Sequence, residues 1–212
     1  MKESVLREKD IGKQIELGYA PNYPKVNDRV NDEERTNECL TIQDKFYGGK
    51  IMTIRHATAA DLDAIAEVEA ECFPPAEAAT KSDFAERIQY YGNHFWLMFE
   101  EKKLIAFVDG FVTDESDLTD DMYENVSMHK ENGAWQMIFG VNTLPEYRKH
   151  GYAGELIRCA VDDAKKQGRR GLVLTCKERL VSYYAKFGFV DEGISDKSTH
   201  GNVVWHQMRL VF

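Results

Sequence analysis

The sequence contains no uninterrupted apolar run long enough to span a membrane, and its first residues lack the apolar core of a signal peptide. Cysteine is scarce, and no Cys-x-x-Cys pair or metal-ligand spacing is present. The four cysteines among 212 residues are Cys39, Cys72, Cys159 and Cys176. Neither a disulfide framework nor a zinc module is indicated. We expect a cytoplasmic protein with free thiols and no metal.

Basic residues are fewer than acidic residues. Lysine and arginine number 27 against 36 aspartates and glutamates, which gives a formal net charge of -9. Because binding to nucleic acid depends chiefly on neutralising phosphates with Lys and Arg, this balance argues against a nucleic-acid partner. It suits a cationic small molecule better, although acidic surfaces commonly serve solubility alone.

The first quarter of the chain differs from the rest. Apolar residues are sparse there and show no sustained period, so we expect a poorly ordered N-terminal extension at residues 1–51, followed by one domain at residues 52–212. The stretch Gly48-Gly49-Lys50-Ile51-Met52 can also be back-translated as a ribosome-binding site and a start codon. Under that hypothesis Met52 is the natural initiator; the alternative is a real but dispensable tail. The codons at positions 48 and 49 distinguish the two.

From Met52 onward the apolar residues alternate between strand-like and helix-like periods. Strands are expected at residues 53–57, 94–99, 104–112, 137–141, 172–176, 189–194 and 203–211. Helices are expected at residues 59–72, 80–91, 151–167 and 180–187, with a long connection at 113–134. This order predicts an α/β fold, a mixed central sheet of about seven strands flanked by about four helices.

The most informative stretch is residues 135–156, which read WQMIFGVNTLPEYRKHGYAGEL. An apolar strand leads through a glycine-containing turn into a helix start, so several backbone N–H groups point toward one place. The positive end of the helix dipole adds to them, and together they form a site for phosphate oxygens. The turn lacks the Lys-Ser/Thr of a P-loop and the glycine spacing of a dinucleotide fingerprint.

Two motifs carry a family resemblance. The Arg-x-x-Gly-x-Ala pattern at residues 148–153 resembles the pyrophosphate loop of the GNAT superfamily of acyl-CoA-dependent N-acetyltransferases. Residues 183–189, YYAKFGF, resemble the family's Tyr-x-x-x-Gly-Phe signature. More narrowly, LVLTCKERLVSYYAKFGF is similar to the matching segment of arylalkylamine (serotonin) N-acetyltransferases. The resemblance covers about residues 53–211 and implies the GNAT fold, acetyl-CoA as donor and an amine as acceptor.

The resemblance also implies residues for the donor half of a site. Backbone groups of Val141, Asn142 and Thr143 would pair with the pantetheine arm as a neighbouring strand does. The diphosphate would lie against the turn formed by Arg148, Lys149, His150, Gly151, Tyr152, Ala153 and Gly154. Arg148 either makes a charge-assisted contact there or is a solvated surface residue.

Tyr184 matches the family's general acid. A phenol with a pKa near roughly 10 is suited to protonating a departing thiolate. The alternative is a core tyrosine that packs the short helix, which is the role we expect for its neighbour Tyr183.

The sequence identifies the residues that would bind the amine acceptor less clearly. Phe73, Pro74 and Glu77 lie where the arylalkylamine group has its acceptor-site loop, and His200 is a further candidate. An ammonium must lose a proton before its nitrogen can attack. Glu77, His129 and His200 are open candidates for the base, and each is also explained as an ordinary polar residue.

These features predict an N-acetyltransferase that moves an acetyl group from acetyl-CoA to a small primary amine. Direct attack in a ternary complex is expected, because Cys176 has no adjacent histidine to activate it. The expected partners are acetyl-CoA and a small amine, with neither nucleic acid nor membrane, for a monomer or homodimer. The alternatives are acetylation of a protein N-terminus or lysine, and a non-catalytic acyl-CoA-binding module.

Overall fold

The computed structural model describes residues 43–47 and 49–212. Most of the expected N-terminal extension lies outside these residues, as does Gly48 of the initiation hypothesis. Within them, a strand at Gln43–Tyr47 precedes Met52, whose side chain is fully buried. The sheet therefore begins ahead of residue 52.

An eight-stranded mixed sheet organises these residues, in the spatial order β1-β2-β3-β4-β5-β6-β8-β7. Neighbouring strands are antiparallel except for β5 and β6, which are parallel. The strands are β1 (Gln43–Tyr47), β2 (Lys50–His56), β3 (Phe95–Glu100), β4 (Lys103–Thr113), β5 (Trp135–Thr143), β6 (Gly171–Cys176), β7 (Val190–Ile194) and β8 (His206–Val211). The mixed α/β prediction is confirmed, and the additional strand is β1.

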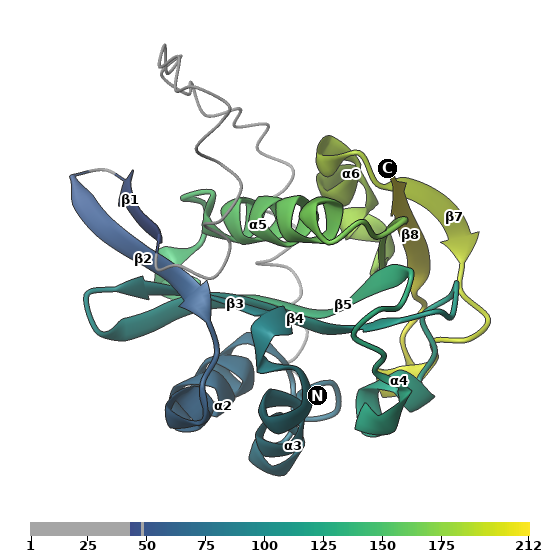
Figure 1. Cartoon of the computed structure of the whole chain (residues 1–212), viewed down its shortest axis with the longest axis horizontal. Coiled ribbons are helices and arrows are strands. Elements are labelled where there is room, and N and C mark those ends of the chain that lie inside the picture. Colours follow the sequence, from purple (N-terminus) through teal and green to yellow (C-terminus); the bar gives the residue numbers. More distant parts are fainter. Residues whose placement is uncertain (1–42, 48) are drawn as a thin grey trace, which may run out of the picture. The chain divides into compact units, whose positions relative to one another are not determined.

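Helices cover both faces of the sheet: α5 crosses one face, and α2 and α3 lie against the other (Figure 1). The α-helices are α2 (Leu62–Cys72), α3 (Lys81–Tyr91), α4 (Asp121–Glu124), α5 (Tyr152–Lys166) and α6 (Val181–Tyr184). Short 3-10 helices occur at Ala59–Asp61, Gly92–His94, Val126–Met128, Pro145–Tyr147, Glu178–Leu180, Ala185–Phe187 and His200–Asn202. In the described part of the chain, no helix combines the length and apolar character that a membrane span requires.

Local sequence explains where the longer helices begin and end. At the start of α3, the Asp83 backbone N–H donates to the Thr80 hydroxyl oxygen and the Thr80 N–H donates to the Asp83 carboxylate, which is a capping box. Helix α2 stops at Phe73, because Pro74 and Pro75 cannot continue it. Lys165 and Lys166 occupy the last turn of α5, where cations favour the helix dipole.

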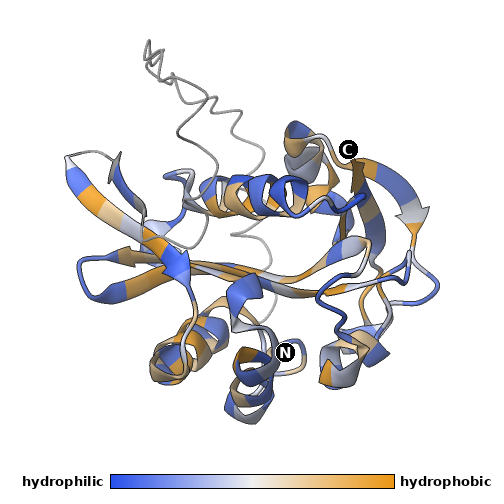
Figure 2. Cartoon of the chain, in the orientation of Figure 1, coloured by the Kyte–Doolittle hydropathy of each residue, from blue (hydrophilic) through white to orange (hydrophobic). Residues whose placement is uncertain are grey.

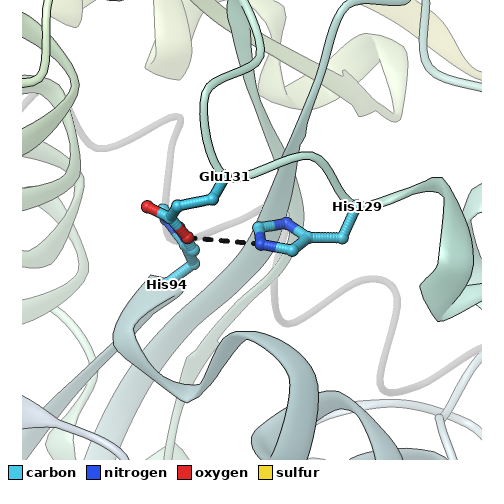
Figure 3. A group of neighbouring side chains, drawn as sticks. All are labelled: His94, His129 and Glu131. Atoms are coloured by element: carbon cyan, nitrogen blue, oxygen red, sulfur yellow. Dashed lines mark hydrogen bonds and ion pairs between the residues drawn. The ribbon is translucent and has the colours of Figure 1, made fainter.

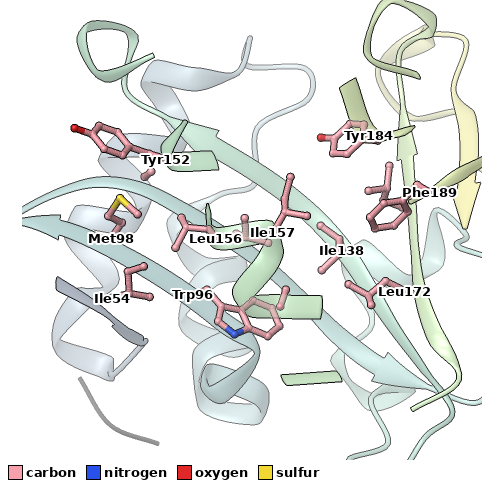
Figure 4. Close-up of a cluster of buried hydrophobic side chains, with 14 of the residues drawn as sticks. Ile54, Trp96, Met98, Ile138, Tyr152, Leu156, Ile157, Leu172, Tyr184 and Phe189 are labelled. Atoms are coloured by element: carbon pink, nitrogen blue, oxygen red, sulfur yellow. The ribbon is translucent and has the colours of Figure 1, made fainter. Parts of the chain in front are cut away.

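Two apolar cores lie on opposite faces of the sheet. Figure 2 shows apolar residues through the central strands, with polar and apolar residues alternating along the helices. One core packs α5 and α6 onto the sheet and includes Trp96, Ile138, Leu156, Leu172 and Tyr184 (Figure 4). The other packs α2 and α3 and includes Ile65, Phe84, Phe107, Met137 and Val173. Because both faces are covered, β3, β4 and β6 are nearly continuous apolar runs.

The pairing between β5 and β6 covers only part of their length. It joins residues 135–138 to residues 171–174 and stops at the pair Ile138–Leu174. Beyond that point, residues 140–143 pair with β4 alone and residues 175–176 pair with β8 alone. The register between β4 and β5 also shifts there, since Gly140 opposes Asp109 but Ile138 opposes Gly110, which leaves Phe139 as a bulge. We call residues 139–143 of β5 and 175–176 of β6, where β5 and β6 no longer pair with each other, the seam.

Candidate active site

The turn after β5 presents a set of unpaired backbone donors. Among the described residues, no carbonyl accepts from the N–H groups of Lys149, His150, Gly151, Ala153 and Gly154, whereas the Glu155 N–H donates to the Gly151 carbonyl at 3.1 Å. Lys149 (φ 68°) and Gly151 (φ 86°) adopt the left-handed conformation, which turns the chain sharply into α5. These donors lie at the N-terminal, positive end of a 15-residue helix.

The side chains of this turn are anchored at its ends. The Arg148 side chain donates from Nε to the Thr143 carbonyl oxygen at 3.0 Å, so it fixes the end of β5. His150 is exposed, with Nδ1 2.8 Å from the Arg148 carbonyl oxygen, and its ring stacks on Tyr152. Lys149 is exposed and Tyr152 is buried. The exposed Lys149 ammonium therefore belongs to the same turn as these backbone donors.

Gly154 sets the distance between the turn and α6. A Cβ atom at this position would lie 3.0 Å from Phe187 Cζ and 3.7 Å from the Tyr183 hydroxyl. A side chain here would require the Phe187 ring to move, so glycine favours this close approach of the first turn of α5. Val141 and Ala153 are half-buried nearby in sequence, on either side of the same turn. The residues predicted to bind acetyl-CoA thus lie in one segment that runs from the end of β5 into the start of α5.

Tyr184 ends α6 and is only 6% exposed. Its ring packs edge-on against Tyr183 and Phe189, and it belongs to the same apolar core as Leu156 and Ile157 of α5 (Figure 4). Its hydroxyl makes no hydrogen bond to any described residue. Burial, with the nearby Tyr183 and Cys176, raises the Tyr184 pKa well above its usual value. The phenol therefore keeps its proton throughout the physiological range, as a proton donor must.

The loop after α2 and the loop between β7 and β8 meet at Glu77. The Lys177 ammonium donates to Glu77 Oε1 at 2.9 Å, and both side chains are largely buried. A Cβ atom on Gly201 would lie 2.8 Å from Glu77 Cγ. Phe73 is half-buried and Pro74 is exposed, with the Pro74 carbonyl accepting from the Glu77 N–H. Glu77 and His200, predicted separately from the sequence, thus lie in two loops that touch.

His200 belongs to a chain of aromatic rings. It stacks on Trp205 with 4.4 Å between ring centroids, and lies 4.6 Å from Tyr123, which in turn lies 4.9 Å from Phe139 in the β5 bulge. Asp120 holds it in place, since His200 Nδ1 lies 3.0 Å from the Asp120 carboxylate. The rings connect the late loop to the seam.

The third candidate base, His129, lies elsewhere (Figure 3). It accepts a hydrogen bond at Nδ1 from the Val112 N–H, and Val112 pairs with Gln136, near the opposite end of β5 from the turn. His129, His94 and Glu131 place three ligand-type atoms within 4.8 Å of one another. Because Nδ1 accepts, the neutral ring carries its proton on Nε2 and donates it to Glu131 rather than offering a lone pair to a metal. Burial lowers the His94 pKa to about 4, which keeps that ring neutral as well.

The structure also reveals buried polar residues that the sequence analysis did not identify. Glu69, Arg87, Asp109 and Asn142 are all at most 5% exposed and lie on the α2/α3 face beside the seam. Arg87 Nη1 donates to Asp109 Oδ2 at 3.2 Å, and Arg87 Nη2 donates to the Tyr123 carbonyl at 2.8 Å. The sequence did contain one indication that Glu69 is buried. It lies four residues after Ile65, on the apolar side of an amphipathic helix.

Comparison with known proteins identifies the family. Residues 62–189 match the model of a family described as Acetyltransferase (GNAT) family. The chain is 30% identical to serotonin N-acetyltransferase of Mesocricetus auratus over 92 residues, which is 43% of each protein. The chain thus spans less than half the length of this curated relative.

Solved structures share the fold at low sequence identity. The loading GNATL domain of CurA from Lyngbya majuscula superposes with a TM-score of 0.66 at 15% identity, covering 76% of this chain and 97% of that one. The ribosomal-protein-S18-alanine N-acetyltransferase of Escherichia coli gives 0.56 at 18% identity, covering 76% and 93%. At these identities the similarity establishes the fold alone.

Proposed function

Since the chain belongs to the GNAT acetyltransferase family, we propose that it transfers an acetyl group from acetyl-CoA to a small primary amine. The observation that carries the proposal is the continuity of the seam with the turn that follows it. Among the described residues, residues 140–143 of β5 have no strand partner on their β6 side, and they lead to a turn in which five N–H groups, those of residues 149–151, 153 and 154, have no carbonyl partner. A long, thin molecule that ends in a diphosphate matches both features.

Acetyl-CoA would be held by residues 141–143 along its arm and by the amides of residues 149–154 at its diphosphate. When bound, it supplies an activated acetyl thioester. Tyr184 would donate a proton to the sulfur as the carbon–sulfur bond breaks, because its buried hydroxyl retains its proton and has no described partner competing for it. Burial raises the Cys176 pKa to about 12, so this thiol is a poor nucleophile and direct attack by the amine is favoured.

The contact between the two acceptor-side loops supports a small acceptor over a peptide. Lys177 and Glu77 form a largely buried ion pair, and Gly201 lies against Glu77. An open channel for an extended chain would require this contact to separate. The neighbouring rings of Tyr123, Phe139 and His200 supply flat apolar surface, which suits an acceptor with an aryl group. The narrower arylalkylamine assignment rests on this feature and on the similarity described above.

An acceptor panel tests the proposed function. Purified protein is incubated with acetyl-CoA and, separately, with arylalkylamines, polyamines and short peptides, and released CoA thiol is measured. We expect release with small amines and the highest kcat/KM for an arylalkylamine. Preference for peptides would replace the small-amine proposal with protein acetylation. Binding of acetyl-CoA without release for any acceptor would indicate a non-catalytic binding module.

A further inference from the structure

Among the described residues, four buried polar atoms beside the seam have no hydrogen-bond partner: Oε2 of Glu69, Nε of Arg87 and both amide atoms of Asn142. Asn142 is completely buried and Glu69 is 5% exposed. Buried polar atoms are normally satisfied by protein or by ordered water, and leaving one unsatisfied costs about 1–3 kcal/mol. Several such atoms in one place therefore indicate a site for a polar ligand or a bound water.

The geometry places this group at the point where β5 separates from β6. Asn142 belongs to the seam, and α2, which carries Glu69, packs against β5 through Cys72, whose thiol lies 3.3 Å from the Thr143 carbonyl oxygen. A Cβ atom on Gly140 would lie 3.0 Å from the Asn142 amide nitrogen and 2.5 Å from Asp109 Oδ1. The absence of a side chain at residue 140 is what lets these polar groups approach the strand.

The groups with the largest effects on the Glu69 pKa come from several elements packed around it. Burial, reinforced by Asp109 on β4, raises the Glu69 pKa to about 7. The Ala79 N–H, the Arg87 guanidinium on α3 and the Asn142 amide favour the carboxylate and oppose that rise. Cys72 is in the same neighbourhood, and burial raises its pKa, so it stays a neutral thiol. Glu69 can therefore change its protonation state near neutral pH.

The other carboxylates and the histidine near the acceptor-side loops already form ion pairs. Asp109 is fixed by Arg87, Glu77 by Lys177, and His200 by Asp120. Among the described residues, Glu69 Oε1 accepts from the Ala79 N–H at 3.0 Å, and Oε2 accepts no hydrogen bond. That bond also ties Glu69 to the loop assigned to the acceptor, so its free oxygen is held at a defined position.

We propose that Glu69 is the base of the reaction, accepting the proton of the acceptor ammonium through a water molecule held between Glu69 Oε2 and the Asn142 amide. This inference rests on the proposed function. The ammonium gives one proton to Glu69, and the freed lone pair forms the carbon–nitrogen bond while the carbon–sulfur bond breaks. The sulfur takes a proton from Tyr184, which regains one from the nitrogen. Glu69 then releases its proton to solvent, so the net products are an amide, free CoA thiol and one proton.

The test compares Glu69→Gln with Glu67→Gln, an exposed position on the same helix. Glutamine keeps an oxygen for the Ala79 N–H, so we expect both variants to fold. For a simple alkylamine at pH 7, Glu69→Gln should lower kcat/KM by about a hundredfold, and Glu67→Gln should leave it unchanged. The acidic limb of the wild-type pH profile, with a midpoint near 7, should disappear in Glu69→Gln.

A second acceptor separates a base from a structural residue. A fluorinated amine of lower basicity is mostly unprotonated at neutral pH and needs no base. The loss in Glu69→Gln should therefore be much smaller for the fluorinated amine than for the alkylamine. An equal loss with both amines, or an acidic limb that persists in Glu69→Gln, would refute the role of Glu69. A wild-type protein inactive with every amine would refute the proposed function instead.

Asn142→Leu provides an independent variant should Glu69→Gln fail to fold. It removes two unsatisfied polar atoms, so its thermal stability should equal or exceed that of the wild type. Because the amide favours the Glu69 carboxylate, its loss should raise the Glu69 pKa and move the acidic limb to higher pH. An unchanged pH profile in a folded, active Asn142→Leu protein would contradict the water-bridged arrangement.

Discussion

Replacing Tyr184 with phenylalanine is expected to lower kcat by about 10²–10⁴-fold, the usual contribution of a positioned proton donor. The substitution removes one hydroxyl and keeps the ring that packs against Tyr183 and Phe189. That hydroxyl has no partner among the described residues, so its removal leaves no buried group unpaired. The effect should appear in kcat, measured under saturating acetyl-CoA and amine, with the affinity for acetyl-CoA within about twofold of wild type by calorimetry.

Tyr90→Phe is the matched control, because Tyr90 is 56% exposed on α3 and contributes to neither core. It should retain the kcat of the wild type. If Tyr184→Phe retains it too, Tyr184 is a packing residue and the thiolate is protonated by another route. If acetyl-CoA affinity falls together with kcat, the hydroxyl contributes to binding rather than to proton transfer.

The second large effect concerns stability. Asp109→Ala is expected to lower the free energy of unfolding by about 3–5 kcal/mol, because it leaves the Arg87 guanidinium buried without its counter-charge. Both side chains are nearly inaccessible, at 6% and 2% exposure. Arg87 also anchors the connection between β4 and β5 through the Tyr123 carbonyl, so the damage should extend to that segment. Urea unfolding followed by circular dichroism measures the change.

The double substitution Arg87→Met with Asp109→Leu is the informative control. It removes both charges together, so it should recover much of the stability that Asp109→Ala loses. Glu146→Ala breaks an exposed pair with Lys103 and should change the unfolding free energy far less. A small effect of Asp109→Ala, comparable to that of Glu146→Ala, would mean that water reaches Arg87 and that the pair is not truly desolvated.

Local patterns in the sequence predicted much of this architecture. The strand–turn–helix at residues 135–166 follows from an apolar run, a glycine in the left-handed region and a long amphipathic helix, all properties of contiguous residues. The strands at residues 95–113 and 171–176 were predicted for the same reason, since burial on both faces makes them continuous apolar runs. The assignments of site residues to acetyl-CoA and to catalysis stay predictions for the experiments above.

The features missed by sequence analysis depend on distant partners. β1 has a mixed, partly charged sequence, and becomes a strand because residues 50–54 provide a pairing edge. Glu69, Arg87 and Asp109 each interrupt an apolar face, and nothing in the local sequence shows that α2, α3 and β4 bring them together. His129 was considered as a base from its position in an acidic connection, whereas its partners Val112 and Glu131 lie near the start of β5.

The seam has a consequence for the mechanics of the whole domain. Strands β1–β5 and strands β6–β8 are joined within the sheet by the four residue pairs between β5 and β6. A coenzyme lying along residues 139–143 would act as an additional strand between the two halves. Its binding would therefore stabilise the contact between the two halves of the sheet. Amide hydrogen exchange at residues 139–143 should therefore slow markedly when acetyl-CoA is added, while residues 135–138, already paired on both sides, should change little. In this fold, the bound coenzyme would itself supply the strand pairing that β5 and β6 lack beyond residue 138.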